Sequence, residues 1–183
     1  MNKTMGLSLL AAFAMMVTLA SGAAWADSAT EIETNTDAAL AQFRAEIPGG
    51  SELAAKARGI LVFPRTLKGG FVVAGEYGEG ALREGGITQG YYSLASGSIG
   101  FQIGAQVKSV LIFFMTDEAL TSFKNSAGWQ VGADASVALI TEGIEGGIDS
   151  DNIRKPIIGF VIGQKGLMAG VSIEGAKITR IER

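Results

Sequence analysis

The N-terminal third of the chain has the spacing of an amphipathic helix. Between residues 29 and 47, apolar residues recur every three or four positions, and acidic residues occupy positions between them. This spacing predicts a helix that Pro48, Gly49 and Gly50 bring to an end. A second, shorter helix is expected from Ser51 to Arg58, because Ser51 can cap its N-terminus and basic residues fall near its C-terminus, as the helix dipole prefers.

After Gly59 the pattern changes to short apolar runs, rich in Val, Ile, Phe and Tyr, that alternate with glycines. Such runs predict strands joined by tight turns. One helix, beginning at residues 116–118 and ending at 126–128, is expected to interrupt them. Two similar segments, at Lys68-Gly69 and Lys165-Gly166, each predict a hairpin turn. The expected strands cover residues 60–63, 71–74, 91–94, 99–103, 107–115, 129–140, 157–162 and 167–173.

Glycine is unusually common, at 26 of 183 residues, and in strands it permits bending and close backbone approach. Most connections between the expected strands are too short for helical crossovers, which indicates antiparallel pairing. The predicted fold is therefore α+β: a strongly bent antiparallel sheet or barrel-like core, with two N-terminal helices and one helix inserted between strands. The glycine-rich segment 75–80 is interpreted as strand, turn and strand rather than as a nucleotide-binding loop, because no helical pattern follows it.

Residues 1–26 have the layout of a cleaved signal peptide. Lys3 provides a small positive region, residues 5–20 form an uncharged apolar run, and Ala24-Trp25-Ala26 offers the small residues that signal peptidases recognise. The run is shorter than the roughly 20 residues that span a bilayer. We therefore expect a periplasmic protein, with membrane association as a further option and retention of the segment as an anchor as the alternative. The remaining chain is expected to comprise an amphipathic helix region at 27–52 and a main domain at 53–183.

The composition excludes several classes of chemistry. The chain contains no histidine and no cysteine, which excludes disulfides, Cys/His zinc sites, cysteine nucleophiles and Ser-His-Asp triads. A net charge of −3 argues against nucleic-acid binding, which favours a basic surface. Glu142, Glu145, Asp149 and Asp151 could supply oxygen ligands to calcium, but they lack the order of an EF-hand loop, and a solvated acidic loop is preferred. We expect neither an enzyme nor a bound metal or cofactor.

One group of basic residues stands out. No acidic residue occurs between Glu52 and Glu76, and the cations in that interval flank the predicted strand 60–63. If the helix end and the next hairpin tip lay on the same edge, these cations could hold a phosphate or an anionic lipid headgroup, arginine as a bidentate fork and lysine as a point charge. The alternative is that they are simply solvated at a helix end and a turn. The predicted lipid- or phosphate-binding residues are Lys56, Arg58, Arg65, Lys68 and Lys165.

Several blocks of the sequence resemble the SYLF domain, a family also known through its yeast members as an actin-binding domain. Together the blocks extend from about residue 53 to residue 178 and stand in the order of the family. They comprise Ala57-Arg58-Gly59-Ile60-Leu61-Val62-Phe63-Pro64, Gly70-Phe71, Gly75-Glu76-Tyr77-Gly78-Glu79-Gly80-Ala81-Leu82 and residues 98–106, 110–115, 132–137 and 165–175.

The resemblance implies a binding module without enzymatic activity. Eukaryotic members of the family bind phosphoinositides and, in some cases, actin filaments, whereas bacterial members are mostly exported. Actin is not an expected partner in a periplasm, so the implied ligand is a lipid or another anionic amphiphile of the cell envelope. The alternative is a structural or protein-interaction module of the periplasm that binds an envelope protein and no lipid.

Overall fold

Two helices precede the sheet. The computed structural model, which describes residues 27–70, 73–99, 106–140, 154–164, 166–168 and 170–183, places α2 at Ala29–Glu46 and α3 at Gly50–Lys56. Ser28 and Glu31 form a reciprocal capping box at the start of α2. Between the helices, Gly49 takes a φ of 78°, which glycine adopts without strain. Both helices lie where the sequence pattern predicted them.

The strands and the third helix follow in chain order. Helix α4, Asp117–Asn125, lies where predicted, and the hydroxyl of Thr116 caps it by accepting from the amide of Ala119. The strands are β1 Gly59–Gly70, β2 Val73–Glu84, β3 Ile87–Ile99, β4 Gln106–Phe114, β5 Trp129–Gln130, β6 Ala138–Ile140, β7 Ile157–Gly163, β8 Gly166–Leu167 and β9 Lys177–Ile181.

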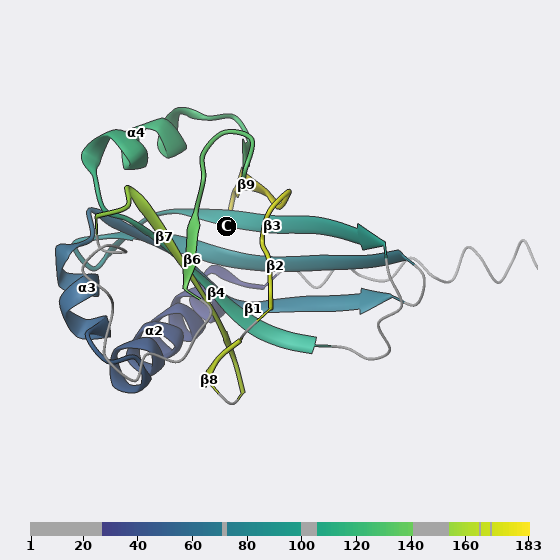
Figure 1. Ribbon diagram of the computed structural model, residues 1–183, viewed down its shortest axis with the longest axis horizontal. Helices are drawn as coiled ribbons and strands as arrows, with labels where there is room; N and C mark the ends of the chain where they lie inside the picture. Colours follow the sequence, from purple (N-terminus) through teal and green to yellow (C-terminus); the bar gives the residue numbers. More distant parts are fainter. Residues whose placement is uncertain (1–26, 71–72, 100–105, 141–153, 165, 169) are drawn as a thin grey trace, which may run out of the picture.

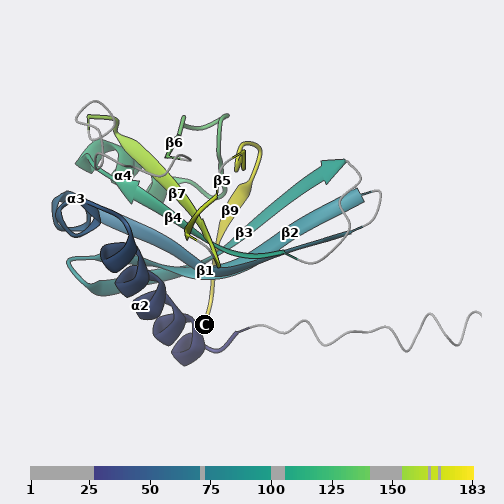
Figure 2. The ribbon, with the colours of Figure 1, turned by 60° about the horizontal axis from the view of Figure 1, so that its bottom comes forward.

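The strands form one curled sheet in the order β5-β9-β3-β2-β1-β4-β7-β6, with β8 paired to β7. Neighbours pair antiparallel except β6 and β7, which are parallel. The sheet is a trough: α4 and the short C-terminal strands lie on its concave side, and α2 and α3 lie on its convex side (Figures 1 and 2). The predicted α+β fold with a strongly bent sheet is confirmed.

The trough buries apolar side chains on both faces, because alternate residues of a strand point to opposite sides. On the concave face, Phe114, Phe123 and Trp129 belong to one buried cluster, with the rings of Phe123 and Trp129 5.5 Å apart. On the convex face, the ring of Phe43 from α2 lies 4.8 Å from both Phe113 and Phe160. The central strands β1, β4 and β7 are therefore buried on both sides over much of their length.

The strands differ from the predicted ones in length. The glycine-rich residues 75–80 lie inside the continuous strand β2, so their interpretation as strand, turn and strand was wrong. Most of 129–140 and 167–173 is turn or irregular rather than strand, and β9 had not been predicted. The two expected hairpins are present, since β1 pairs with β2 and β7 pairs with β8. Lys68 and Gly69 lie within β1 rather than at the turn, and Lys165 lies outside the described residues.

Strand β1 bends at Pro64. The register shifts there against both neighbours, β2 and β4, as expected because proline cannot donate to the ladder and is tolerated at a bulge. Across from the bend, a Cβ at Gly80 would lie 2.0 Å from the carbonyl oxygen of Val62. Glycine at position 80 therefore allows the two backbones to approach where the sheet curls.

Candidate functional site

Strands β1 to β4 extend past α2 and α3, and we call the parts beyond these helices their distal halves: the second halves of β1 and β3 and the first halves of β2 and β4. The distal halves carry a row of exposed apolar side chains. We call this the convex apolar row. Its members are Val107 of β4, Leu67 of β1, Tyr77 of β2 and Ala95 of β3, and each is the register partner of the next across the sheet. Val107 lies four residues from the convex-core residue Leu111, so it points to the same face. Figure 2 shows α2 beneath the other end of these strands.

The row is exposed although its members are large and apolar. Val107, Leu67 and Tyr77 expose 44%, 47% and 49% of their surfaces. Ile87, the other large apolar residue of comparable exposure in the described part of the chain, lies at the start of β3 and outside the row. Adjacent exposed apolar residues on one surface mark an interaction site more often than isolated ones do.

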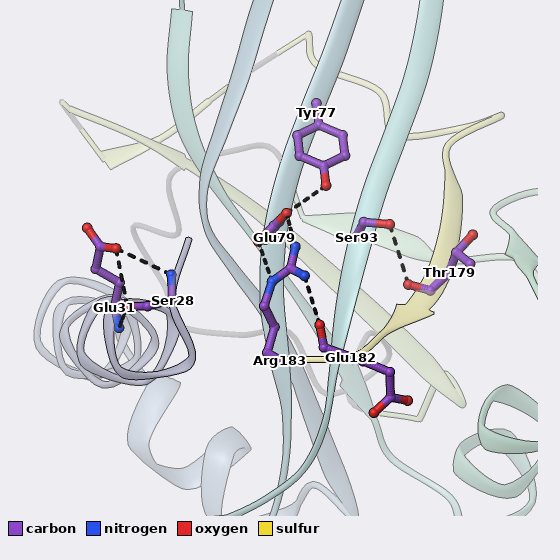
Figure 3. A network of polar contacts seen from close by, with 8 residues as sticks. All are labelled: Ser28, Glu31, Tyr77, Glu79, Ser93, Thr179, Glu182 and Arg183. Atoms are coloured by element: carbon purple, nitrogen blue, oxygen red, sulfur yellow. Dashed lines mark hydrogen bonds and ion pairs between the residues drawn. The ribbon is translucent and has the colours of Figure 1, made fainter. Parts of the chain in front are cut away.

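A polar network borders the row (Figure 3). The Tyr77 hydroxyl donates to Glu79 Oε1 at 2.7 Å, and Arg183 Nε donates to Glu79 Oε2 at 3.1 Å. Arg183 Nη2 also pairs with Oε1 of Glu79, whose side chain is almost fully buried. Desolvation, followed by the hydrogen bond to Glu79 and its charge, raises the pKa of Tyr77 to about 12. Tyr77 is therefore held as a neutral phenol with its ring in the apolar row.

The predicted basic residues separate into two groups. Lys56, at the end of α3, pairs with Glu52 at 2.6 Å. Arg58, directly before β1, lies 3.6 Å from Asp117. Arg65 and Lys68 lie in the second half of β1. At about 3.3 Å per residue, the ten steps from Arg58 to Lys68 cover roughly 30 Å of extended chain, so one headgroup cannot contact all four cations.

Arg65 and Lys68 also differ in the face that they occupy. Arg65 is the register partner of Glu79 on the convex face, next to the apolar row, whereas Lys68 is the partner of Glu76 and follows Thr66 on the concave face. Arg65 is exposed and forms no ion pair within the described residues. Lys165 and the acidic residues Glu142, Glu145, Asp149 and Asp151 lie outside the described residues. Binding by any of these side chains stays a prediction.

An ion pair is buried on the concave face. Lys108 Nζ of β4 lies 3.0 Å from Glu76 Oε2 of β2, and the two side chains are only 3% and 6% exposed. The second oxygen, Glu76 Oε1, is buried and has no hydrogen-bond partner among the described residues. The sequence pattern missed this pair, because Lys108 and Glu76 are far apart along the chain and only the strand order brings them together.

A second polar centre joins α2 to the sheet. Arg83 Nη2 contacts Glu33 Oε2 at 2.9 Å and Asp37 Oδ1 at 2.7 Å, and the Tyr91 hydroxyl donates to Glu33 at 2.9 Å. Neighbouring polar groups, including the Tyr91 hydroxyl and the Arg83 guanidinium that contact Glu33, lower the pKa of Glu33 more than its burial raises it. The acidic face of α2 is therefore used to fix the helix on β2 and β3.

Arg83 also lines two surface clefts. The first, of about 410 Å³, lies between α2, α3 and the β2–β3 turn, and we call it the α2–α3 cleft; its lining includes Leu40, Arg44, Ala54 and Ile60. The second, of about 600 Å³, lies between α2, β3 and β9. The sequence pattern missed both clefts, since their walls come from distant elements.

The described part of the chain contains neither a helix suited to span a membrane nor a group of side chains suited to hold a metal ion. None of its helices combines the length and the apolar character needed to cross a bilayer. Within the same residues, histidine, cysteine, aspartate and glutamate side chains form no group of three or more that could hold a metal ion.

Comparison with known protein families gives a match over the second half of the chain. Residues 95–182, from the end of β3 through β9, match the model of the family described as Ysc84, Las17-binding protein actin regulator. This is the SYLF family that the sequence blocks had predicted. No curated protein matches the chain.

Proposed function

Because residues 95–182 belong to the Ysc84 (SYLF) family of binding domains, we propose that this protein is a non-catalytic module that binds anionic lipid membranes through its convex apolar row. The observation that carries the proposal is the row itself. Three large apolar side chains in register lie uncovered on the distal strands, beyond the region that α2 and α3 cover.

The chemistry of the row suits the surface of a bilayer. Tyrosine is favoured at membrane interfaces because it combines an apolar ring with a polar hydroxyl. Here the Tyr77 hydroxyl is already bonded to Glu79, so the ring can contact lipid without leaving an unpaired donor. Leu67 and Val107 add apolar surface beside it, at about 25 cal/mol for each Å² removed from water.

The margins of the row carry positive charge. Arg65 lies two residues before Leu67 on the same face of β1. Lys177 of β9 is the register partner of Ala95. Both side chains are exposed, and neither forms an ion pair within the described part of the chain. A basic side chain near an anionic membrane contributes about 1 kcal/mol, and this contribution is screened by salt. The proposal therefore specifies anionic rather than neutral lipid.

We place this activity in the cell envelope. The support is the signal-peptide layout of residues 1–26 and the absence of cysteine, which leaves no need for oxidative folding. The family description names an actin regulator, but for an exported protein we propose lipid as the partner. An envelope protein that binds the same row is the competing candidate.

Flotation with liposomes tests the proposal. The purified protein should float with vesicles that contain anionic lipid, less so at higher salt, and not with neutral vesicles. Leu67→Ser with Val107→Ser should abolish flotation, whereas the matched control Ile87→Ser, which changes an exposed apolar residue outside the row, should not. Arg65→Glu should weaken flotation, and Arg154→Glu, an exposed cation that precedes β7, should leave it unchanged.

The result also separates the two candidates. No flotation with any vesicle would overturn the lipid proposal and favour the envelope-protein partner. Equal flotation of the Leu67→Ser, Val107→Ser variant would overturn the assignment of the row.

A further inference from the structure

We propose that the α2–α3 cleft binds the acidic headgroup of a single-chain amphiphile, with Arg44 and Arg83 at the headgroup and Leu40 and Ile60 against the first carbons of the chain. The cleft lies on the proximal half of the sheet, beside α2 and α3, whereas the convex apolar row lies on the distal half. The inference therefore concerns a monomeric ligand, and it does not depend on the membrane proposal.

Arg83, which lines the cleft, has an incomplete set of hydrogen bonds. The Arg83 side chain is 10% exposed, and its Nη2 carries both ion pairs to α2. Its Nε is buried and has no hydrogen-bond partner among the described residues. Leaving such a donor unpaired costs free energy, and each unpaired buried group calls for an explanation. A ligand oxygen that approaches the guanidinium would supply the missing acceptor.

The charge balance of the cleft favours an acidic ligand. Arg44 of α2 lines the cleft, is exposed and forms no ion pair within the described residues. Arg83 is already paired with Glu33 and Asp37, so Arg44 supplies the positive charge that remains available to a ligand in the cleft. Because the Asp37 side chain is 71% exposed, it can turn to water when a ligand oxygen takes its place at Arg83. Arginine suits this role because its planar donors match carboxylate and phosphate oxygens.

Apolar residues and two glycines form most of the rest of the lining. The apolar residues include Leu40 of α2, Ile60 of β1 and the alanines of α3, and the volume of about 410 Å³ is within the range of small-molecule sites. Only a single chain fits such a space, because a bilayer surface cannot enter a cleft between two helices. The same headgroup chemistry could come from free phosphate, so the experiment must separate the two sources.

Titration calorimetry below the micelle concentration tests the site on the full protein, with decyl phosphate, inorganic phosphate and the neutral amphiphile decyl maltoside as probes. Decyl phosphate should bind one molecule per chain, more tightly than either of the others. Equal binding of inorganic phosphate would overturn the role of the apolar lining. Equal binding of decyl maltoside would overturn the role of the arginines.

Three substitutions in the lining of the cleft give the test its specificity. Arg44→Gln should weaken binding of decyl phosphate about fivefold, the factor expected for an exposed charge contact. Ala55→Trp, which fills the cleft from an exposed position of α3, should abolish binding. Asp37→Asn should strengthen binding, since it removes the competing carboxylate.

The matched control is Arg154→Gln, which changes an exposed arginine just before β7 and outside both proposed sites, and which should bind decyl phosphate like the parent protein. Circular dichroism verifies that each variant is folded. Binding that survives Ala55→Trp in a folded protein would overturn the proposal. An equal loss of affinity in Arg154→Gln would also overturn it, because binding would then depend on overall charge. Flotation with liposomes measures the convex row, so either proposal can fail without the other.

Discussion

The buried ion pair between Lys108 and Glu76 allows a quantitative test of what holds the distal strands together. Both side chains lie on the concave face and are almost fully excluded from water. Lys108→Met keeps most of the apolar stem of the lysine and removes only its charge. The carboxylate of Glu76, whose Oε1 already has no partner, would then be buried without any counter-charge.

The expected cost is large relative to the stability of a domain. Removing one partner of a buried ion pair typically costs 3–5 kcal/mol, because the remaining charge is left uncompensated, and the whole free energy of unfolding of a domain is about 5–15 kcal/mol. We therefore expect Lys108→Met to lower the free energy of unfolding by about 3–5 kcal/mol. Replacing both partners, Lys108→Met with Glu76→Leu, should restore most of that loss, since no buried charge remains.

Urea unfolding of the parent, both single variants and the double variant completes a double-mutant cycle. The matched control is the exposed pair Lys56 and Glu52, with side chains 52% and 69% exposed, where Lys56→Met should cause no measurable change. A Lys108→Met variant as stable as the control, or a double variant no more stable than the single, would refute the reasoning that burial makes this pair strong.

Three further predictions concern packing and ionisation. Gly80→Ala should destabilise the fold by about 1–3 kcal/mol, because the new methyl would meet the backbone of β1, whereas Gly75→Ala, with open space around it, should leave the melting temperature unchanged. Phe43→Ala should cost about 3–5 kcal/mol in urea unfolding by emptying the convex core; a loss no larger than that of an exposed alanine substitution would contradict the burial of α2. The pKa values of all three tyrosines are raised, that of Tyr77 to about 12. The stability that these phenols contribute should therefore be complete below their ordinary pKa of 10.0 and be lost as the pH rises toward 12; phenolate absorbance in the folded protein that rises with an ordinary midpoint would contradict this.

The elements were predictable where one physical signal dominated. The spacing of Ile32, Leu40 and Phe43 identified α2, because only one face of that helix is buried. The apolar runs identified the doubly buried segments of β1, β4 and β7. Residues 64–70 of β1, most of β2 after residue 74, and residues 87–90 and 95–98 of β3 were missed. Glycine and charged residues interrupt the apolar pattern there, and partner strands rather than intrinsic propensity hold these residues in the sheet.

The candidate site was harder to predict for the same reason. Leu67, Tyr77 and Val107 come from three strands, and only the register brings them into one row. The sequence identified Arg65 as a candidate, but it could not show that β1 separates Arg58 from Lys68. Neither could it identify Arg83, which looks like one more solvated arginine until α2 covers it.

A spin label on the convex apolar row would test the central claim most directly. Because the chain has no cysteine, Leu67→Cys and Ile87→Cys each provide one site for a nitroxide label. When vesicles of anionic lipid are added, the label at position 67 should become shielded from a water-soluble relaxation agent and more accessible to oxygen, which concentrates in lipid, while the label at position 87 should stay in water. Unchanged accessibility at position 67, or equal changes at both positions, would contradict a membrane contact through this row.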